Sequence, residues 1–62
     1  MTVRKGQKYR RLPGDAEYRV YDVVQSAVLA GKVGTRFSTW TPTHRFHNNP
    51  QRRTGFLLVE DV

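Results

Sequence analysis

Positive charge in two short stretches is the feature of this sequence with the clearest chemical consequence. Five of the eleven Lys and Arg residues fall between positions 4 and 11, and three more fall in the segment 44–53 beside two histidines. The rest of the chain holds all five acids and is negative. Clustered cations attract polyanions, of which nucleic acid is the commonest, followed by acidic proteins and anionic membranes.

The first basic stretch alternates along a predicted strand, so each face of that strand carries cations. Lys8 and Arg10 alternate with Tyr9 and Arg11. Aromatic rings beside cations can stack on bases, but a small domain needs most of its aromatics for its core. We therefore assign the three Phe residues to the core and take as candidate surface aromatics Tyr9, Tyr21 and Trp40.

The second basic stretch reads His-Arg-Phe-His-Asn-Asn-Pro-Gln-Arg-Arg over residues 44–53. Its polar side chains are types that contact phosphates and base edges, and a long polar loop on a small scaffold commonly carries function. The same residues also suit simple turn formation and solubility, and the two interpretations weigh about equally. The candidate binding residues here are Arg45, His47, Arg52 and Arg53.

Catalytic and metal chemistry have little support. His44 and His47 have a spacing that places both on one face of a helical turn, but no third ligand lies nearby, and there is no Cys. Gly31 and Gly34 lack the spacing of a phosphate-binding loop. We expect no enzyme activity, no cofactor and no metal site.

A length of 62 residues allows one domain, 1–62, with a thin core. No apolar stretch approaches the length of a membrane span or a signal sequence, so we expect no membrane partner and a cytoplasmic location. Turn signals at 13–15, 31–34 and 48–50 separate five predicted strands, at 7–12, 17–24, 27–33, 35–40 and 56–59. Thr41-Pro42 has the form of a helix start, which predicts one helical turn over 43–47.

An alternative remains for the second and third strands. Apolar residues between Ala16 and Gly31 recur at helical spacing, and Asp15 is a suitable N-cap. This pattern predicts a helix over residues 16–30 in an α+β fold. Tyr18, Val20 and their neighbours are poor helix formers, however, so strands are favoured.

The order of these elements resembles a small SH3-like β-barrel of five strands, with one short helical turn before the last strand. The resemblance rests on Gly6-Gln7-x-Tyr9, Tyr18-x-Val20-x-x-Val23, His44-Arg45-Phe46 and the segment 55–60. It looks like the short, mostly uncharacterised SH3-like proteins of bacteria and their phages, and residues 44–54 are then a basic polar insertion. The resemblance implies a fold but no activity, since such barrels bind DNA, RNA, peptides and proteins.

Two functions follow as hypotheses. The first is a non-enzymatic protein that binds nucleic acid through Lys8, Arg10, Arg11, Arg45, Arg52 and Arg53. The alternative is a phage-type adaptor or inhibitor, in the host cytoplasm, whose cations meet an acidic patch on a host protein and whose anchors are Trp40 or Tyr9. Self-association is a further option, because a thin core gains from burying an apolar face.

Overall fold

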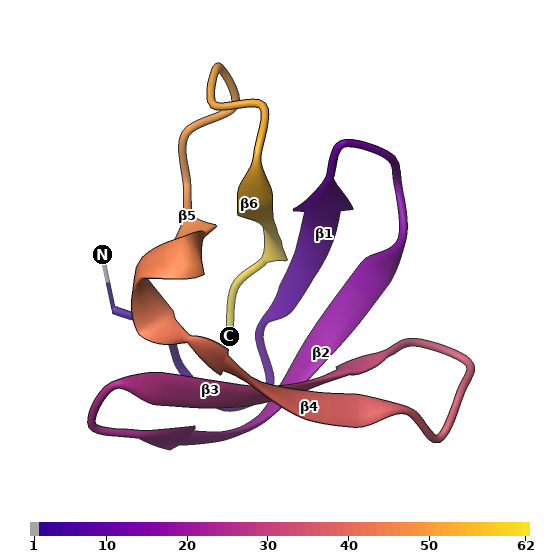
Figure 1. The fold of residues 1–62 in the computed structure, drawn as a ribbon, viewed down its shortest axis with the longest axis vertical. Coiled ribbons are helices and arrows are strands. Elements are labelled where there is room, and N and C mark those ends of the chain that lie inside the picture. The colour runs from indigo at the N-terminus through magenta and orange to yellow at the C-terminus, as the bar shows by residue number, and fades with distance from the viewer. Residues whose placement is uncertain (1) are drawn as a thin grey trace.

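The computed structural model describes residues 2–62 as one curved, mainly β sheet with a single 3₁₀ turn (Figure 1). The six strands are β1 (Lys8–Leu12), β2 (Glu17–Val24), β3 (Ala27–Lys32), β4 (Ser38–Pro42), β5 (Phe46–His47) and β6 (Gly55–Glu60), and the turn η1 (Thr43–Arg45) lies between β4 and β5. Their order in the sheet is β4-β3-β2-β1-β6-β5. In Figure 1, β3 and β4 cross beneath the upright strands β1, β6 and β5.

The predicted mainly β class is confirmed, and the alternative helix over residues 16–30 is wrong. This segment forms β2 and β3, which pair in antiparallel fashion around a turn at Gln25-Ser26. A bulge between Val20 and Asp22 shifts the register of β2. Because of the extra residue, Val20 and Val23 both reach the core although they are three positions apart. The helical spacing in the sequence is therefore produced by a bulged strand.

The strand count and several element boundaries also differ from the prediction. A sixth strand, the two-residue β5, pairs with β6 in parallel, and it takes up the end of the predicted helical turn. Within residues 2–62 the sheet has free edges at β4 and β5, so these strands do not close it into a barrel. β4 begins at Ser38 instead of 35, and Pro42 ends β4 instead of opening the helix. The helical turn itself is present over Thr43–Arg45.

The later start of β4 follows from a tight turn after β3. The Lys32 carbonyl accepts hydrogen bonds from both the amide and the hydroxyl of Thr35, and the Lys32 amide donates to the Phe37 carbonyl. Gly34, with φ of 85°, supplies the backbone conformation that this reversal needs. The turn leaves the Phe37 side chain 57% exposed, which corrects its assignment to the core.

The core is an aromatic cluster on the concave side of the sheet. The rings of Tyr9 and Phe46 meet edge to face at 4.9 Å, Phe46 stacks on Phe56 at 4.7 Å, and Tyr18 meets Phe56 edge to face at 5.3 Å. Apolar residues complete it, namely Val3, Val20, Val28 and Ala30. Tyr9 is fully buried, so the prediction of a surface role for this ring is wrong. Its hydroxyl donates to Oε1 of Gln7 at 2.9 Å, which satisfies the polar atom inside the core.

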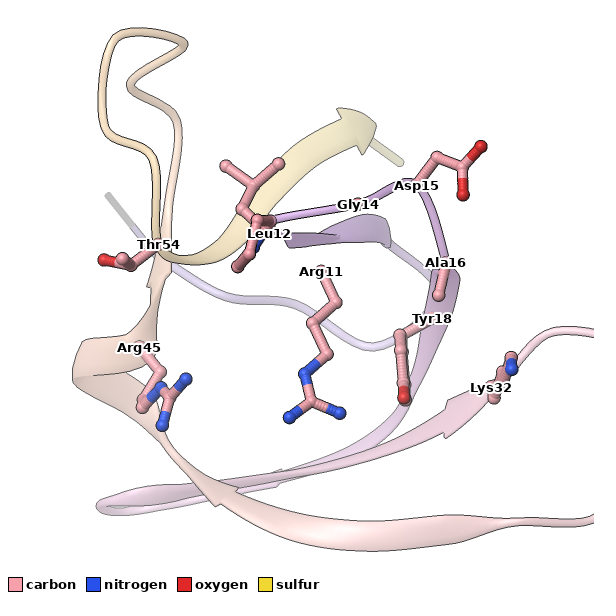
Figure 2. Close-up of a pocket in the computed structure, with 10 residues that line it drawn as sticks. Arg11, Leu12, Gly14, Asp15, Ala16, Tyr18, Lys32, Arg45 and Thr54 are labelled. Atoms are coloured by element: carbon pink, nitrogen blue, oxygen red, sulfur yellow. The ribbon is translucent and has the colours of Figure 1, made fainter.

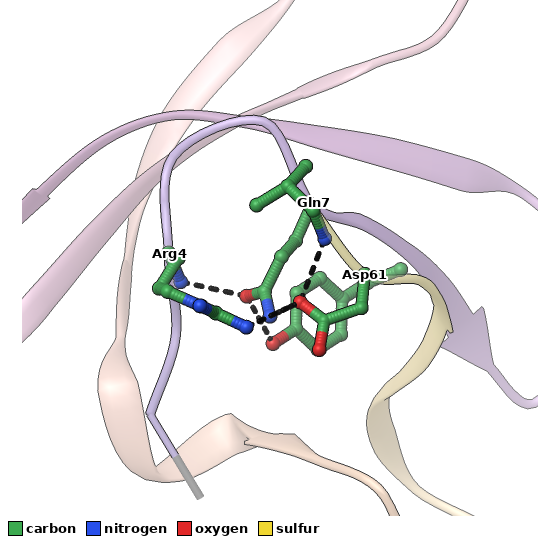
Figure 3. Close-up of polar contacts among 5 residues, drawn as sticks. Arg4, Gln7 and Asp61 are labelled. Atoms are coloured by element: carbon green, nitrogen blue, oxygen red, sulfur yellow. Dashed lines mark hydrogen bonds and ion pairs between the residues drawn. The ribbon is translucent and has the colours of Figure 1, made fainter.

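Gln7 links the two ends of the described chain (Figure 3). Its buried side chain accepts from the Arg4 amide at 2.6 Å and donates through Nε2 to Oδ1 of Asp61 at 2.8 Å. Arg4 adds an ion pair to the same carboxylate at 2.9 Å. The Gln7 hydrogen bond, together with the Val62 amide and Arg4, lowers the pKa of Asp61 below its ordinary value. Burial raises the pKa of Tyr9 to about 12.

Acid is expected to weaken this link. Because the pKa of Asp61 is lowered in the folded state, its stabilising contribution is present above the ordinary carboxyl pKa of about 4 and is lost as pH falls through the folded value. Urea midpoints at pH 7 and pH 3 should therefore differ less for Asp61→Asn than for the unchanged protein. An identical pH dependence in both proteins would show that Asp61 contributes nothing to the loss.

Candidate anion-binding surface

Two hollows flank the turn at the end of β1 and share its residues Leu12, Pro13 and Gly14. The inner cleft, of about 600 Å³, opens on the concave side and contains Arg11, Arg45 and Lys32. The outer cleft, of about 710 Å³, lies on the other side of the turn and is lined in part by Arg10, Leu57, Arg52 and Arg53. One end of the molecule therefore carries cations on both sides of a single turn.

Strand alternation sends neighbouring arginines of β1 to opposite clefts. Arg11 pairs in register with Phe56 and lies on the same face as Tyr9, whereas Arg10 pairs with Leu57 on the opposite face. Both positions are fixed by pairing with β6, whose residues lie more than forty positions away in the chain. The two arginines that end the first basic stretch are thus divided between the two clefts.

Arg45 reaches the inner cleft because η1 and β6 hold its backbone. It is the last residue of η1, and the next residue, Phe46, is anchored in the core. Gly55 lies against it: a β-carbon on this glycine would be 2.5 Å from the Arg45 carbonyl oxygen, and its φ of 79° is one that other residues rarely adopt. The close approach of β6 to η1 thus places Arg45 across the cleft from Arg11.

The side chains of the inner cleft converge on one space (Figure 2). The Arg11 and Arg45 guanidinium groups extend into it, with Tyr18 beside Arg11 and Lys32 further along the same side. Asp15, the one acid among the lining residues, directs its carboxylate away from the guanidinium groups. The geometry favours a ligand with more than one negative charge.

His47 organises the loop of the outer cleft and is not a free ligand. Its Nδ1 accepts a hydrogen bond from the Asn49 amide at 3.1 Å. Its Nε2 therefore carries the proton and donates to the Thr54 carbonyl, at 2.8 Å. The ring is 9% exposed, and the exposed Arg52 and Arg53 lie in the loop that it holds. The prediction that His47 contacts a partner is replaced by a structural role.

Lys8 is also separated from the candidate surface. Its Nζ lies 2.7 Å from a Glu60 carboxylate oxygen and 3.5 Å from one of Glu17. The hydrogen bond that the Lys8 ammonium donates to the Glu60 carboxylate raises the pKa of Lys8 and lowers the pKa of Glu60. Its charge is compensated locally, so it offers little to a polyanion. In contrast, no ion pair within residues 2–62 involves Arg10, Arg11, Arg45, Arg52 or Arg53.

The two remaining candidates, Tyr21 and Trp40, lie on the opposite face of the sheet. Trp40 pairs in register with Leu29 and is 50% exposed. Tyr21 packs over Gly31, where a β-carbon would come within 2.5 Å of the Tyr21 ring. Neither ring lines the inner or the outer cleft.

Sequence reasoning did not identify Lys32 and Tyr18, which line the inner cleft, or Phe37, which lines a smaller hollow beside it. The available signal for Phe37 was Gly34, in the Val-Gly-Thr sequence ahead of it, because glycine favours a turn in place of a strand. Gly34 does adopt a positive φ in the structure. Lys32 could have been placed only from the register of β2 and β3, which pairs it with Tyr18.

No group of three or more His, Asp or Glu residues suited to a metal occurs in the part of the chain that the structure describes. Across residues 2–62 we find no helix with the length and apolar character that a membrane crossing requires. No family model, curated protein or solved structure matches this chain.

Proposed function

We propose that this chain is a small non-enzymatic protein that binds nucleic acid through its basic end, the group of five arginines around the turn that follows β1. The observation that carries the proposal is the convergence of five arginines from two distant stretches of sequence around one turn. They are Arg10, Arg11, Arg45, Arg52 and Arg53. Because carboxylates compensate Lys8 and Arg4 elsewhere, the uncompensated positive charge of these stretches is concentrated at this end.

The chemistry of the surface suits a chain of phosphates better than a single anion. Arginine presents a planar fork of donors that matches phosphate oxygens. The two clefts lie on either side of one turn, so a phosphate backbone that passes over Gly14 would meet arginines on both sides. Each neutralised phosphate releases condensed counterions, which supplies affinity without sequence specificity.

We further infer an SH3-like arrangement for the sheet. The support is the succession of antiparallel hairpins through β4, followed by a 3₁₀ turn and a last long strand that returns to pair with β1. The motifs that carry the resemblance have structural roles here. Gln7 and Tyr9 build the buried hydrogen-bond network, and Gly55-Phe56 joins the core to η1.

The proposal is tested by the salt dependence of binding. Fluorescence anisotropy with a labelled duplex and a labelled single strand, at several salt concentrations, should show a steep fall in affinity. If all five arginines contact phosphates, the logarithmic slope is about −4.5 for duplex DNA and about −3.5 for a single strand. Absence of binding to both probes at low salt would refute the proposal.

The adaptor hypothesis has one observation in its favour, the exposed Trp40. It lies on β4, an edge strand whose outer backbone groups are unpaired in the sheet, and aromatic residues at such edges are common anchors for a partner strand. Tyr9, the other proposed anchor, is buried. Capture of an acidic protein that requires Trp40 but none of the five arginines would favour this function.

A further inference from the structure

We propose that the inner cleft accepts a single strand of nucleic acid, with a phosphate held between Arg11 and Arg45 and an unstacked base resting against Phe37. This inference rests on the proposed nucleic-acid binding and specifies the form of the ligand. It depends on the floor of the cleft, on the exposure of Phe37 and on the side chains beside it.

The inner cleft shares Arg11, Tyr18 and Arg45 with a smaller hollow of about 140 Å³. We take this smaller hollow as the floor of the cleft, and its lining differs in character from that of the rim. Its other lining residues are two phenylalanines, Phe37 and Phe56, and two threonines, Thr39 and Thr41. Cations therefore border a space floored by aromatic carbon and hydroxyl groups. A duplex keeps its bases stacked inside and presents phosphates, so it would use the rim and leave this floor empty.

Phe37 is placed as a stacking surface would be. Its side chain is 57% exposed, although Phe46 and Phe56 are buried in the same sheet. Its backbone is held by two hydrogen bonds, from its own amide to Oγ1 of Thr35 at 3.2 Å and from the Lys32 amide to its carbonyl at 3.1 Å. An exposed ring on a fixed backbone loses little conformational freedom when a base stacks on it.

The neighbouring hydroxyl groups face the same space. Thr39 pairs with Ala30 and Thr41 pairs with Val28, and cross-strand partners share a face of the sheet, so both threonines lie on the concave side. A hydroxyl both donates and accepts hydrogen bonds, and it therefore accommodates the edge of any base. The floor suits a base without selecting one, which is the pattern expected of sequence-tolerant single-strand binding.

Lys32 continues the line of charge beyond Phe37. It pairs with Tyr18 across β2 and β3, on the same concave face, and lines the inner cleft with Arg11 and Arg45. A strand that crosses the cleft would place one phosphate at the two arginines and the next toward the lysine, with the intervening base directed to the floor. The combination of a positively charged groove with an aromatic ring is typical of single-strand binding sites.

The test compares one substitution against two ligands. Phe37→Ala should lower the affinity for an unstructured single-stranded oligonucleotide about tenfold and leave the affinity for a duplex of the same length unchanged. Trp40→Ala is the matched control, since it removes a similarly exposed ring from the opposite face and should alter neither affinity. Phe37→Trp should retain single-strand binding, and a bound 2-aminopurine probe should quench the indole fluorescence.

The outcomes separate this inference from the proposed function. If neither the single strand nor the duplex binds at low salt, both the proposed function and the single-strand inference are refuted. Binding of both probes that Phe37→Ala leaves unchanged, or lowers equally, overturns the single-strand inference and retains the basic end as a general phosphate surface. Urea unfolding of each variant checks the fold, and failure of Phe37→Trp to bind a single strand while remaining folded would also overturn the inference.

Discussion

Replacing Arg11, Arg45, Arg52 and Arg53 together by Gln is expected to lower the affinity for nucleic acid by roughly a thousandfold. About 1 kcal/mol for each lost phosphate contact, a low value for hydrogen bonds of charged groups, gives this factor. The dependence of affinity on salt should flatten at the same time, by about one unit of slope for each contact removed. Anisotropy titrations at two or three salt concentrations measure both quantities.

A matched variant distinguishes the surface from the net charge. Replacing Arg4, Lys5, Arg19 and Arg36 by Gln removes the same number of charges from positions outside both clefts. This control should bind only slightly more weakly than the unchanged protein. Three of the four arginines of the test variant lie in loops or turns, and the replaced residues of both variants are all exposed. We therefore expect both variants to remain folded. Equal losses in the two variants would contradict a localised surface.

Phe46→Ala is expected to unfold the protein at room temperature. Phe46 contacts both Tyr9 and Phe56 and is 6% exposed, and truncation of a buried Phe costs about 3–5 kcal/mol. A core in a chain this short supplies a total stability of about the same size. Circular dichroism and urea titration should therefore show loss of the cooperative transition.

Phe37→Ala is the natural control for this loss. The ring is 57% exposed, so its removal should change the free energy of unfolding by less than about 0.5 kcal/mol. A Phe46→Ala variant that kept the midpoint of the unchanged protein would contradict the assignment of the aromatic cluster as the core.

The parts of the fold predicted correctly are those specified by local signals. Pro13-Gly14 separates two strands, and the apolar run that contains Phe56 forms a strand. The helical alternative arose because a bulge after Val20 changes the spacing of inward-facing residues, and periodicity does not distinguish a bulged strand from a helix over so few positions. β5 could not be predicted, because two residues joined to β6 in parallel leave no pattern in the sequence.

For the candidate site, charge clustering found the arginines but could not group them. Arg10 and Arg11 are assigned to different clefts, and Lys8 is excluded from the candidate surface, on the basis of their contacts with β6. These contacts come from far along the chain. Tyr9 was misjudged for the same kind of reason. Its hydroxyl finds a partner in Gln7, so a residue that looked amphipathic could be buried completely.

The position of β6 between β1 and β5 also bears on how quickly the protein folds. The β2–β3 and β3–β4 hairpins join residues close in sequence and can form within microseconds. The pairing of β1 with β6 must close a loop of more than forty residues, and the chain entropy lost in this closure is compensated only when the strands make contact. Such non-local pairings set the rate of folding. Arg11 and Arg45 approach one another only after that step, so binding to a refolding chain should appear with the slowest kinetic phase.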